Sequence, residues 1–112
     1  MEARAIGKHL HIAPRKARLV ADMVRNQLVE EALDILAFTP KAAATMIEKL
    51  IRSAVANARV KELDIDNLYV KKIFVDEGFT RKWFRARARG MAFRIRRRRS
   101  HITVILDEKS EE

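Results

Sequence analysis

The side chains with the clearest chemical potential are basic residues concentrated in one stretch, Phe79 to Arg99, which reads FTRKWFRARARGMAFRIRRRR. This basic segment has no Asp or Glu and contains ten basic residues: Arg81, Lys82, Arg85, Arg87, Arg89, Arg94, Arg96, Arg97, Arg98 and Arg99. The remaining residues carry fourteen Lys and Arg against fifteen Asp and Glu, so the formal net charge of +9 comes from this segment. Guanidinium groups fork onto phosphate oxygens and stack on bases. A positive field confined to one segment therefore predicts a polyanionic partner, and nucleic acid fits best.

Aromatic residues are interleaved with these cations. Trp83, Phe84 and Phe93 could stack on unpaired bases, or they could hold two arms of a hairpin together. The sequence leaves these two roles open.

A second set of candidate phosphate-binding residues lies near the N-terminus. Arg15, Lys16 and Arg18 fall in the first turns of an expected helix, where cations oppose the helix dipole and an anionic ligand would offset that cost. An ordinary solvated helix face would produce the same pattern. Three residues of the preceding strand complete the predicted RNA-contacting set: Lys8, His9 and His11.

The sequence contains no pattern typical of a catalytic site or a metal site. His9 and His11 share one face of the expected strand and His101 stands elsewhere, with no Cys to complete a metal site. No nucleophile elbow and no Gly-rich phosphate loop is present. We therefore expect no enzyme activity, no metal and no cofactor.

Length and composition predict one domain over residues 1–112, with an extended hairpin at about 79–99. No apolar run approaches the ~18 residues that span a bilayer, and the N-terminal residues do not resemble a signal peptide. The absence of Cys fits a reducing compartment. These features predict a cytoplasmic protein that does not bind membranes.

The expected elements begin with a strand over residues 3–12, at a sheet edge. Alternate residues of this strand point to opposite faces of the sheet. The more apolar of the two faces carries Arg4, Ile6, Lys8, Leu10 and Ile12. A helix should start at Pro14 and stop near Asn26, with a second, short helix over residues 30–37. The apolar stripe of the first helix is Ala17, Val20, Met23 and Val24.

The strongest helix signal starts at Thr39-Pro40, read as a cap followed by proline at the first helical position. Its apolar stripe is unbroken: Ala43, Met46, Ile47, Leu50, Ile51, Ala54, Val55 and Ala58. Residues 66–78 and 100–106 read as paired strands, the latter with Ile102, Val104 and Leu106 on one face. We expect these strands to continue outward as a hairpin that turns near 88–90.

Together these residues resemble the bacterial family of ribosomal protein twenty-two of the large subunit. The similarity rests on PRKARLVADMVR (14–25), DNLYVKKIFVDEG (66–78), RARGMA (87–92) and SHITVIL (100–106), in order along nearly the whole chain. It implies an α+β fold, with three helices packed on a small antiparallel sheet and a long protruding hairpin. Phe79 and Ala86 stand where the family usually has proline, Met91 and Arg99 where it usually has arginine and threonine, and Ala13 where it usually has a serine cap.

The resemblance also implies a function and partners. Family members bind and organise large-subunit ribosomal RNA, contact neighbouring ribosomal proteins, and line the nascent-peptide exit tunnel with the hairpin. The tunnel-lining tip, where the nascent peptide would pass, would be Arg85, Ala86, Arg87, Ala88, Arg89, Gly90 and Met91.

Two other function classes fit parts of the pattern. A DNA-bending protein could insert a basic ribbon into the minor groove, but such ribbons usually come in pairs from a dimer, and we expect a monomer when free. A membrane-surface module would also use Arg with Trp and Phe, yet the basic segment lacks helical amphipathicity.

Overall fold

The computed structural model describes residues 1–77, 81–86, 92–97 and 99–109, with the side chains of 81–86 and 92–97 excepted. The elements follow in the order β1 (Glu2–Leu10), α1 (Pro14–Val24), α2 (Val29–Ala37), α3 (Ala42–Val60), the 3-10 helix η1 (Ile65–Asn67), β2 (Leu68–Glu77), β3 (Arg81–Ala86), β4 (Ala92–Arg97) and β5 (Ser100–Glu108). The predicted α+β class, with three helices and a small antiparallel sheet, is confirmed.

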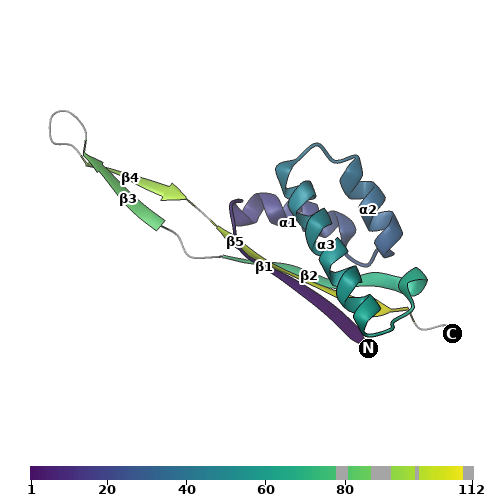
Figure 1. Ribbon diagram of the computed structural model, residues 1–112. Helices are drawn as coiled ribbons and strands as arrows, with labels where there is room; N and C mark the ends of the chain where they lie inside the picture. Colours follow the sequence, from purple (N-terminus) through teal and green to yellow (C-terminus); the bar gives the residue numbers. More distant parts are fainter. Residues whose placement is uncertain (78–80, 87–91, 98, 110–112) are drawn as a thin grey trace.

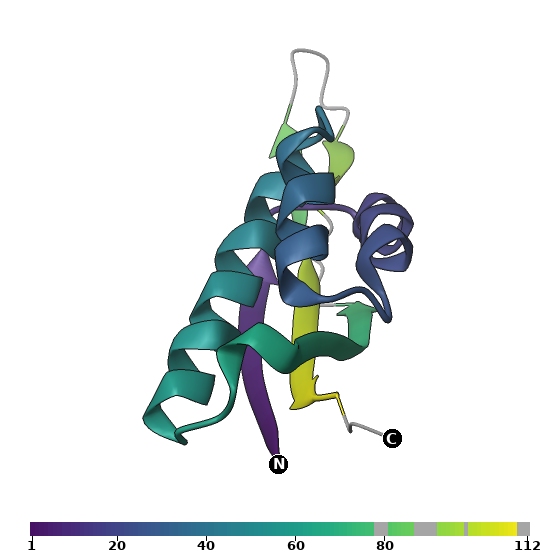
Figure 2. The same ribbon diagram turned by 90° about the vertical axis from the view of Figure 1, so that its right-hand side faces the viewer.

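The body of the molecule is a helical layer on one face of a three-stranded sheet. The strand order is β1-β5-β2, both pairings are antiparallel, and β1 lies at an edge as predicted. α3 crosses β1 and β5, α1 lies over β2, and α2 packs against the other two helices. Figures 1 and 2 show all three helices on the same side of the sheet. The last strand in the sequence is thus the central one, held on both sides.

The apolar stripe of α3 forms the middle of the core, as predicted. Ile47 and Ile51 have no exposed surface, and Met46, Leu50 and Val55 are partly buried against the core. From the sheet, the predicted inward face of β5 meets this stripe: Ile102, Val104 and Leu106 are fully buried. The apolar residues of β5 recur at every second position and those of α3 about every 3.6 positions, so each element has one apolar face, and the two faces meet in the core.

The predicted start of α3 at Thr39-Pro40 is wrong. The helix begins at Ala42 after Lys41, whose side chain makes no capping hydrogen bond. Thr39 belongs instead to the end of α2, because its hydroxyl donates to the carbonyl oxygen of Ile35 at 2.7 Å. A Thr side chain can satisfy a free carbonyl at a helix C-terminus as well as cap an N-terminus, and here the first use prevails.

α1 begins at Pro14 and ends near Asn26, as expected. Asn26 adopts a left-handed backbone with φ 67°, which Asn tolerates better than most residues. Its backbone N–H donates to the carbonyl of Val70 at 2.8 Å, and the N–H of Val70 donates back to Gln27 at 2.9 Å. The connection between α1 and α2 is thereby fastened to β2. Within the predicted stripe of α1, only Met23 is exposed, at 43%.

The predicted facing of β1 is also wrong. Ala3 and Ala5 are buried under the helices, whereas Ile6 is 47% exposed on the opposite face. A β-bulge explains the change: Gly7 pairs with Ile102 but Leu10 pairs with Ser100, so β1 carries one additional residue there. The bulge returns the later residues Leu10 and Ile12 to the core side. A Cβ on Gly7 would lie 3.0 Å from the Leu10 side chain, so a larger residue here would make the Leu10 side chain shift.

The predicted hairpin is present as a separate two-stranded ribbon of β3 and β4, paired antiparallel. Figure 1 shows this ribbon beyond the end of the three-stranded sheet, away from the helices. The molecule is consequently elongated, measuring 68 × 26 × 19 Å. The last described pair of the sheet is Glu77 with Ser100, and the first pair of the ribbon is Arg81 with Arg97. Three residues lie between the two pairs on one strand and two on the other, so the pairing register shifts by one residue between sheet and ribbon. The predicted turn at 88–90 lies outside the described residues.

The packing of α3 predicts a matched pair of stability effects. Ile51→Ala should lower the free energy of unfolding by about 2–5 kcal/mol, because it leaves a cavity among fully buried neighbours. Val60→Ala, on the same helix but 84% exposed, should change it by less than ~0.5 kcal/mol. Urea unfolding followed by far-UV circular dichroism measures both. Equal losses in the two variants would mean that α3 does not form the core.

Candidate nucleic-acid interface

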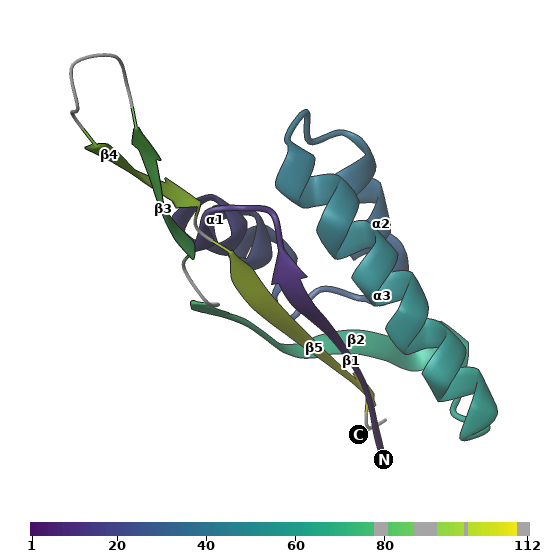
Figure 3. The ribbon, with the colours of Figure 1, turned by 60° about the vertical axis from the view of Figure 1, so that its left-hand side comes forward.

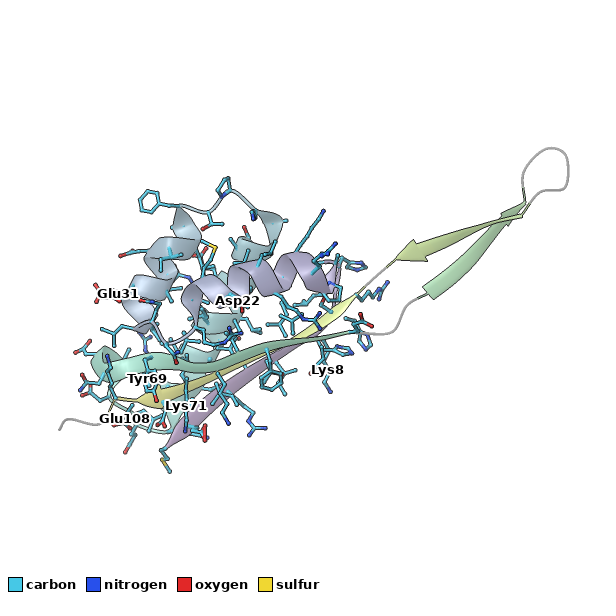
Figure 4. All side chains as sticks on the ribbon, turned by 180° about the vertical axis from the view of Figure 1, so that it is seen from behind. Lys8, Asp22, Glu31, Tyr69, Lys71 and Glu108 are labelled. Carbon is cyan, nitrogen blue, oxygen red and sulfur yellow. The ribbon has the colours of Figure 1, made fainter. Side chains whose placement is uncertain are left out.

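Two of the predicted phosphate ligands sit in the first turn of α1. The side chains of Arg15 and Lys16 are exposed there and form no hydrogen bond or ion pair with a described residue, and the first turn of α1 contains no acidic residue. Ala13 offers no side-chain cap, so the N–H groups at this end bond only to its carbonyl oxygen or remain available. Figure 4 shows that this end of α1 points toward the ribbon. Two cations and the positive end of a helix dipole thus share one corner of the body.

Arg18, predicted with them, has a structural role as well. Its guanidinium Nη2 donates to the carbonyl oxygen of Val75 at 3.1 Å. Further along the helix, Arg25 donates from Nη2 to the carbonyl of Ile73 at 2.9 Å and pairs through Nη1 with Asp22 at 2.6 Å. The carbonyls belong to the outer edge of β2, so these arginines clamp α1 on that edge. The residue pattern contained no signal for this role of Arg25.

The histidines are arranged differently from the expectation. β1 ends at Leu10, so His11 lies beyond the strand and does not share a strand face with His9. His9 adopts φ 55° in the bulge, and its backbone N–H donates to Nδ1 of His101 at 3.1 Å. The two imidazole rings meet edge to face with centroids 4.7 Å apart. His101, which sequence reasoning placed apart from His9, is therefore its direct neighbour.

The ribbon places cations opposite one another. Arg81 pairs in register with Arg97, and Lys82 with Arg96. Like charges directly opposite across two strands destabilise the pairing. An anion lying along the ribbon would remove that penalty, so the register itself favours an anionic ligand.

The other ribbon residues complete this picture. Trp83 stands opposite Ile95, Phe84 opposite Arg94, and Arg85 opposite Phe93, with Ala86 and Ala92 closing the described pairs. Apolar and basic residues are therefore interleaved along both strands. The predicted sites Arg87, Arg89 and Arg98, and the tip residues Arg87 to Met91, lie outside the described residues.

Arg99 marks the junction between ribbon and body. Its Nε is buried and has no hydrogen-bond acceptor among the described residues. The adjacent Ser100 is fully buried, and its hydroxyl donates to the carbonyl oxygen of Ile12 at 2.7 Å. This bond ties the start of β5 to the segment leading into α1. The base of the ribbon is thus fixed against the corner that carries Arg15 and Lys16.

The opposite end of the sheet is electrically balanced. Lys71 lies 3.3 Å from Oδ2 of Asp107 and 3.6 Å from Oε2 of Glu2, and the N-terminal ammonium lies 3.4 Å from Oδ1 of Asp107. Burial raises the pKa of Asp107, but hydrogen bonds from the Glu108 N–H, Lys71 and the N-terminus outweigh it, leaving that pKa below its ordinary value. The hydrogen bond to Asp107, helped by the charge of Glu2, raises the pKa of Lys71. Figure 4 shows Lys71 on the sheet face turned away from the helices.

Within the described part of the chain, no group of three or more His, Asp or Glu is placed to hold a metal ion. None of the described helices has the length and apolar character needed to cross a bilayer.

Comparison with known proteins decides the relationship. Residues 5–107 match the family described as Ribosomal protein L22p/L17e. The chain belongs to this ribosomal protein L22p/L17e family. Two relatives come from Leptospira biflexa serovar Patoc, strains Patoc 1 / Ames and Patoc 1 / Paris, and each is a "Large ribosomal subunit protein uL22". Each is 60% identical over 110 residues, covering 96% of this chain and 95% or 94% of the relative. The resemblance to the L22 family noted from the motifs is thus confirmed.

The clamp on β2 predicts that neighbouring cations of α1 differ in their effect on stability. Arg25→Ala should lower the free energy of unfolding by about 1 kcal/mol, since the variant lacks a charged donor to a carbonyl at a half-exposed site. Arg15→Ala should leave it within ~0.5 kcal/mol, because Arg15 has no described partner. Chemical denaturation at fixed ionic strength distinguishes the two. Equal stability of both variants would argue against the clamp.

The Asp107 cluster predicts a dependence of stability on pH. Because the pKa of Asp107 is lowered in the folded state, its contribution is present above the ordinary pKa of 3.8 and is lost as the pH falls through the folded value. Asp107→Asn should therefore be less stable than the parent protein at about pH 6, and the difference should shrink on acidification toward about pH 2.5. Thermal unfolding across that range measures it. A difference that is constant with pH would show that the carboxylate charge plays no part.

Proposed function

We propose that this protein is a structural component of the large ribosomal subunit, acting in the cytoplasm by binding and organising large-subunit ribosomal RNA. The names of the relatives support membership of that subunit. The observation that carries RNA binding is the ribbon register, in which Arg81 faces Arg97 and Lys82 faces Arg96. Two opposed cation pairs on a narrow ribbon, attached to a body of almost no net charge, are destabilising on their own and are stabilised beside a polyanion.

The proposed contact set has two parts. The ribbon contributes Arg81, Lys82, Arg85, Arg87, Arg89, Arg94, Arg96, Arg97 and Arg98, with Arg99 at its base. The adjoining corner of the body contributes Lys8, His9, His11, Arg15, Lys16 and Arg18. Phosphate contacts from these groups fix position, and the shape of the folded RNA supplies specificity. Arg18 serves this surface with the part of its side chain that remains exposed.

The ribbon is proposed to line the nascent-peptide exit tunnel, as the family resemblance implies. Its length favours this, because β3 and β4 carry the ribbon away from the body into space where RNA can surround both faces (Figure 1). The tip residues 85–91 would then face the nascent peptide, and neighbouring ribosomal proteins would contact the body. The role is structural, without catalysis or a cofactor.

A DNA-bending dimer is less well supported. The apolar stripe of α3, which could otherwise join two copies that insert paired ribbons, is covered by the sheet of the same chain. We propose that the free protein is a monomer.

Replacing ribbon cations should weaken binding to a large-subunit ribosomal RNA transcript without unfolding the body. Arg96→Ala/Arg97→Ala should reduce the slope of log affinity against log salt by about 1 for each phosphate that the variant no longer neutralises. The control is Lys49→Ala/Arg59→Ala, which removes the same charge from exposed positions on α3. Filter binding across about 50–300 mM salt measures both variants. If the ribbon variant and the control weaken binding equally, net charge alone drives binding and the proposal is wrong.

A further inference from the structure

The sheet has one face that no described element covers. The helices occupy the other face (Figure 3), and β5 lies in the middle of the uncovered one with β1 and β2 on either side. Residues opposite one another in register form rows across this open face. One row is Ile6, Thr103 and Phe74, and the next is Arg4, Ile105 and Lys72.

The first row is an apolar strip with an aromatic ring at one end. Phe74 is 42% exposed, whereas its neighbours Ile73 and Val75 are buried on the helix side. Thr103, in the centre, is only 8% exposed although no described layer lies above it, because Ile6 and Phe74 flank it across the strands. Phe74 therefore presents its ring on an open sheet rather than filling the core.

Cations border this strip on both sides. Arg4 and Lys72 lie two residues along the strands, and Lys8 lies on the opposite side with the His9–His101 pair. Arg4, Lys8 and Lys72 are exposed and form no ion pair with a described residue. Figure 4 shows Lys8 on the side away from the helices.

The acidic residues of the same face offset only part of this positive charge. Glu2 and Asp107 lie at the far end and are engaged by Lys71 and the N-terminus. Asp76 lies two residues from Phe74 on the same face, opposite His101 in register, so one carboxylate stands against the three cations Arg4, Lys8 and Lys72. The middle of the face, around the apolar strip, thus retains an excess of positive charge.

We propose that this open face is a second RNA-binding surface, where an unpaired base stacks on Phe74 while Arg4 and Lys72 hold the adjoining phosphates. An aromatic ring on an open sheet, flanked by cations, suits an unstacked nucleotide, because every base has a π-face and every nucleotide carries a negatively charged phosphate. A protein partner would need acidic residues opposite Arg4 and Lys72 as well as an apolar surface over the strip, whereas a single nucleotide supplies both a ring and a phosphate. The inference rests on the proposed function and extends it from the ribbon to the body.

The charge part is tested with Arg4→Ala/Lys72→Ala on the full chain. Against a large-subunit ribosomal RNA transcript, this variant should lower the slope of log affinity against log salt by about 1.4–1.8. The matched control is again Lys49→Ala/Arg59→Ala, which leaves the open face intact. Equal slopes for the variant and its control would overturn the inference.

The stacking part is tested by replacing the ring while keeping apolar bulk. Phe74→Leu should weaken RNA affinity between about 5- and 150-fold, whereas Phe74→Tyr should bind as the parent protein does. Phe38→Leu, at an 88% exposed aromatic on the helical side, is the matched control and should have no effect. Thermal unfolding of each variant shows whether folding is retained. If Leu and Tyr at position 74 bind RNA equally well, stacking on this ring is excluded.

Incorporation of the variants into reconstituted large subunits, compared with their binding to the transcript, separates this inference from the proposed function. Parent protein that fails to bind the transcript contradicts both. Parent protein that binds, with open-face variants that bind equally well but enter reconstituted large subunits poorly, would mean that the face contacts a neighbouring protein, which overturns the RNA inference alone.

Discussion

Repulsion between opposed cations across the β3–β4 ribbon is the constraint on which the rest of the molecule depends. Like charges directly opposite one another across two strands destabilise the pairing of those strands. The register sets Arg81 against Arg97 and Lys82 against Arg96. A two-stranded ribbon is marginal in water without such repulsion. Its ordered form therefore depends on the body that holds its base, and in the proposed function also on the RNA that would lie along it.

The body is built to hold that base. β2 leads into the ribbon and β5 leads out of it, and both are sheet neighbours with fully buried residues such as Val70 and Val104. Ser100 is tied to Ile12, and Arg18 and Arg25 fasten α1 along β2. The charge asymmetry follows the same geometry, because the end of the sheet far from the ribbon neutralises itself around Asp107.

Sequence patterns predicted the elements whose periodicity is unbroken. α3 has an uninterrupted apolar stripe, and β5 alternates cleanly, so both were placed with the correct buried face. Failures occur where one residue changes the pattern. A bulge between Gly7 and Leu10 reverses the facing of β1, and a second between Val70 and Lys72 shifts β2.

The sequence predicted only the part of the proposed binding surface that is marked by a concentration of basic residues. The ribbon cations stand out in composition, but the clamp made by Arg25 and the contact between His9 and His101 join residues distant in sequence. The open face of the sheet could not be predicted either, because its row of Ile6, Thr103 and Phe74 exists only once both bulges set the register. Local periodicity carries no information about which rows meet across strands.

Whether the cationic ribbon holds this protein in the large ribosomal subunit is tested most directly by sucrose-gradient fractionation of a native lysate, with the protein detected by antibody. The account predicts that the protein sediments with the large ribosomal subunit and is released into the light fractions when the ribbon arginines are replaced. Protein that remains in the light fractions while intact, or that sediments equally well without its ribbon charge, would contradict the account.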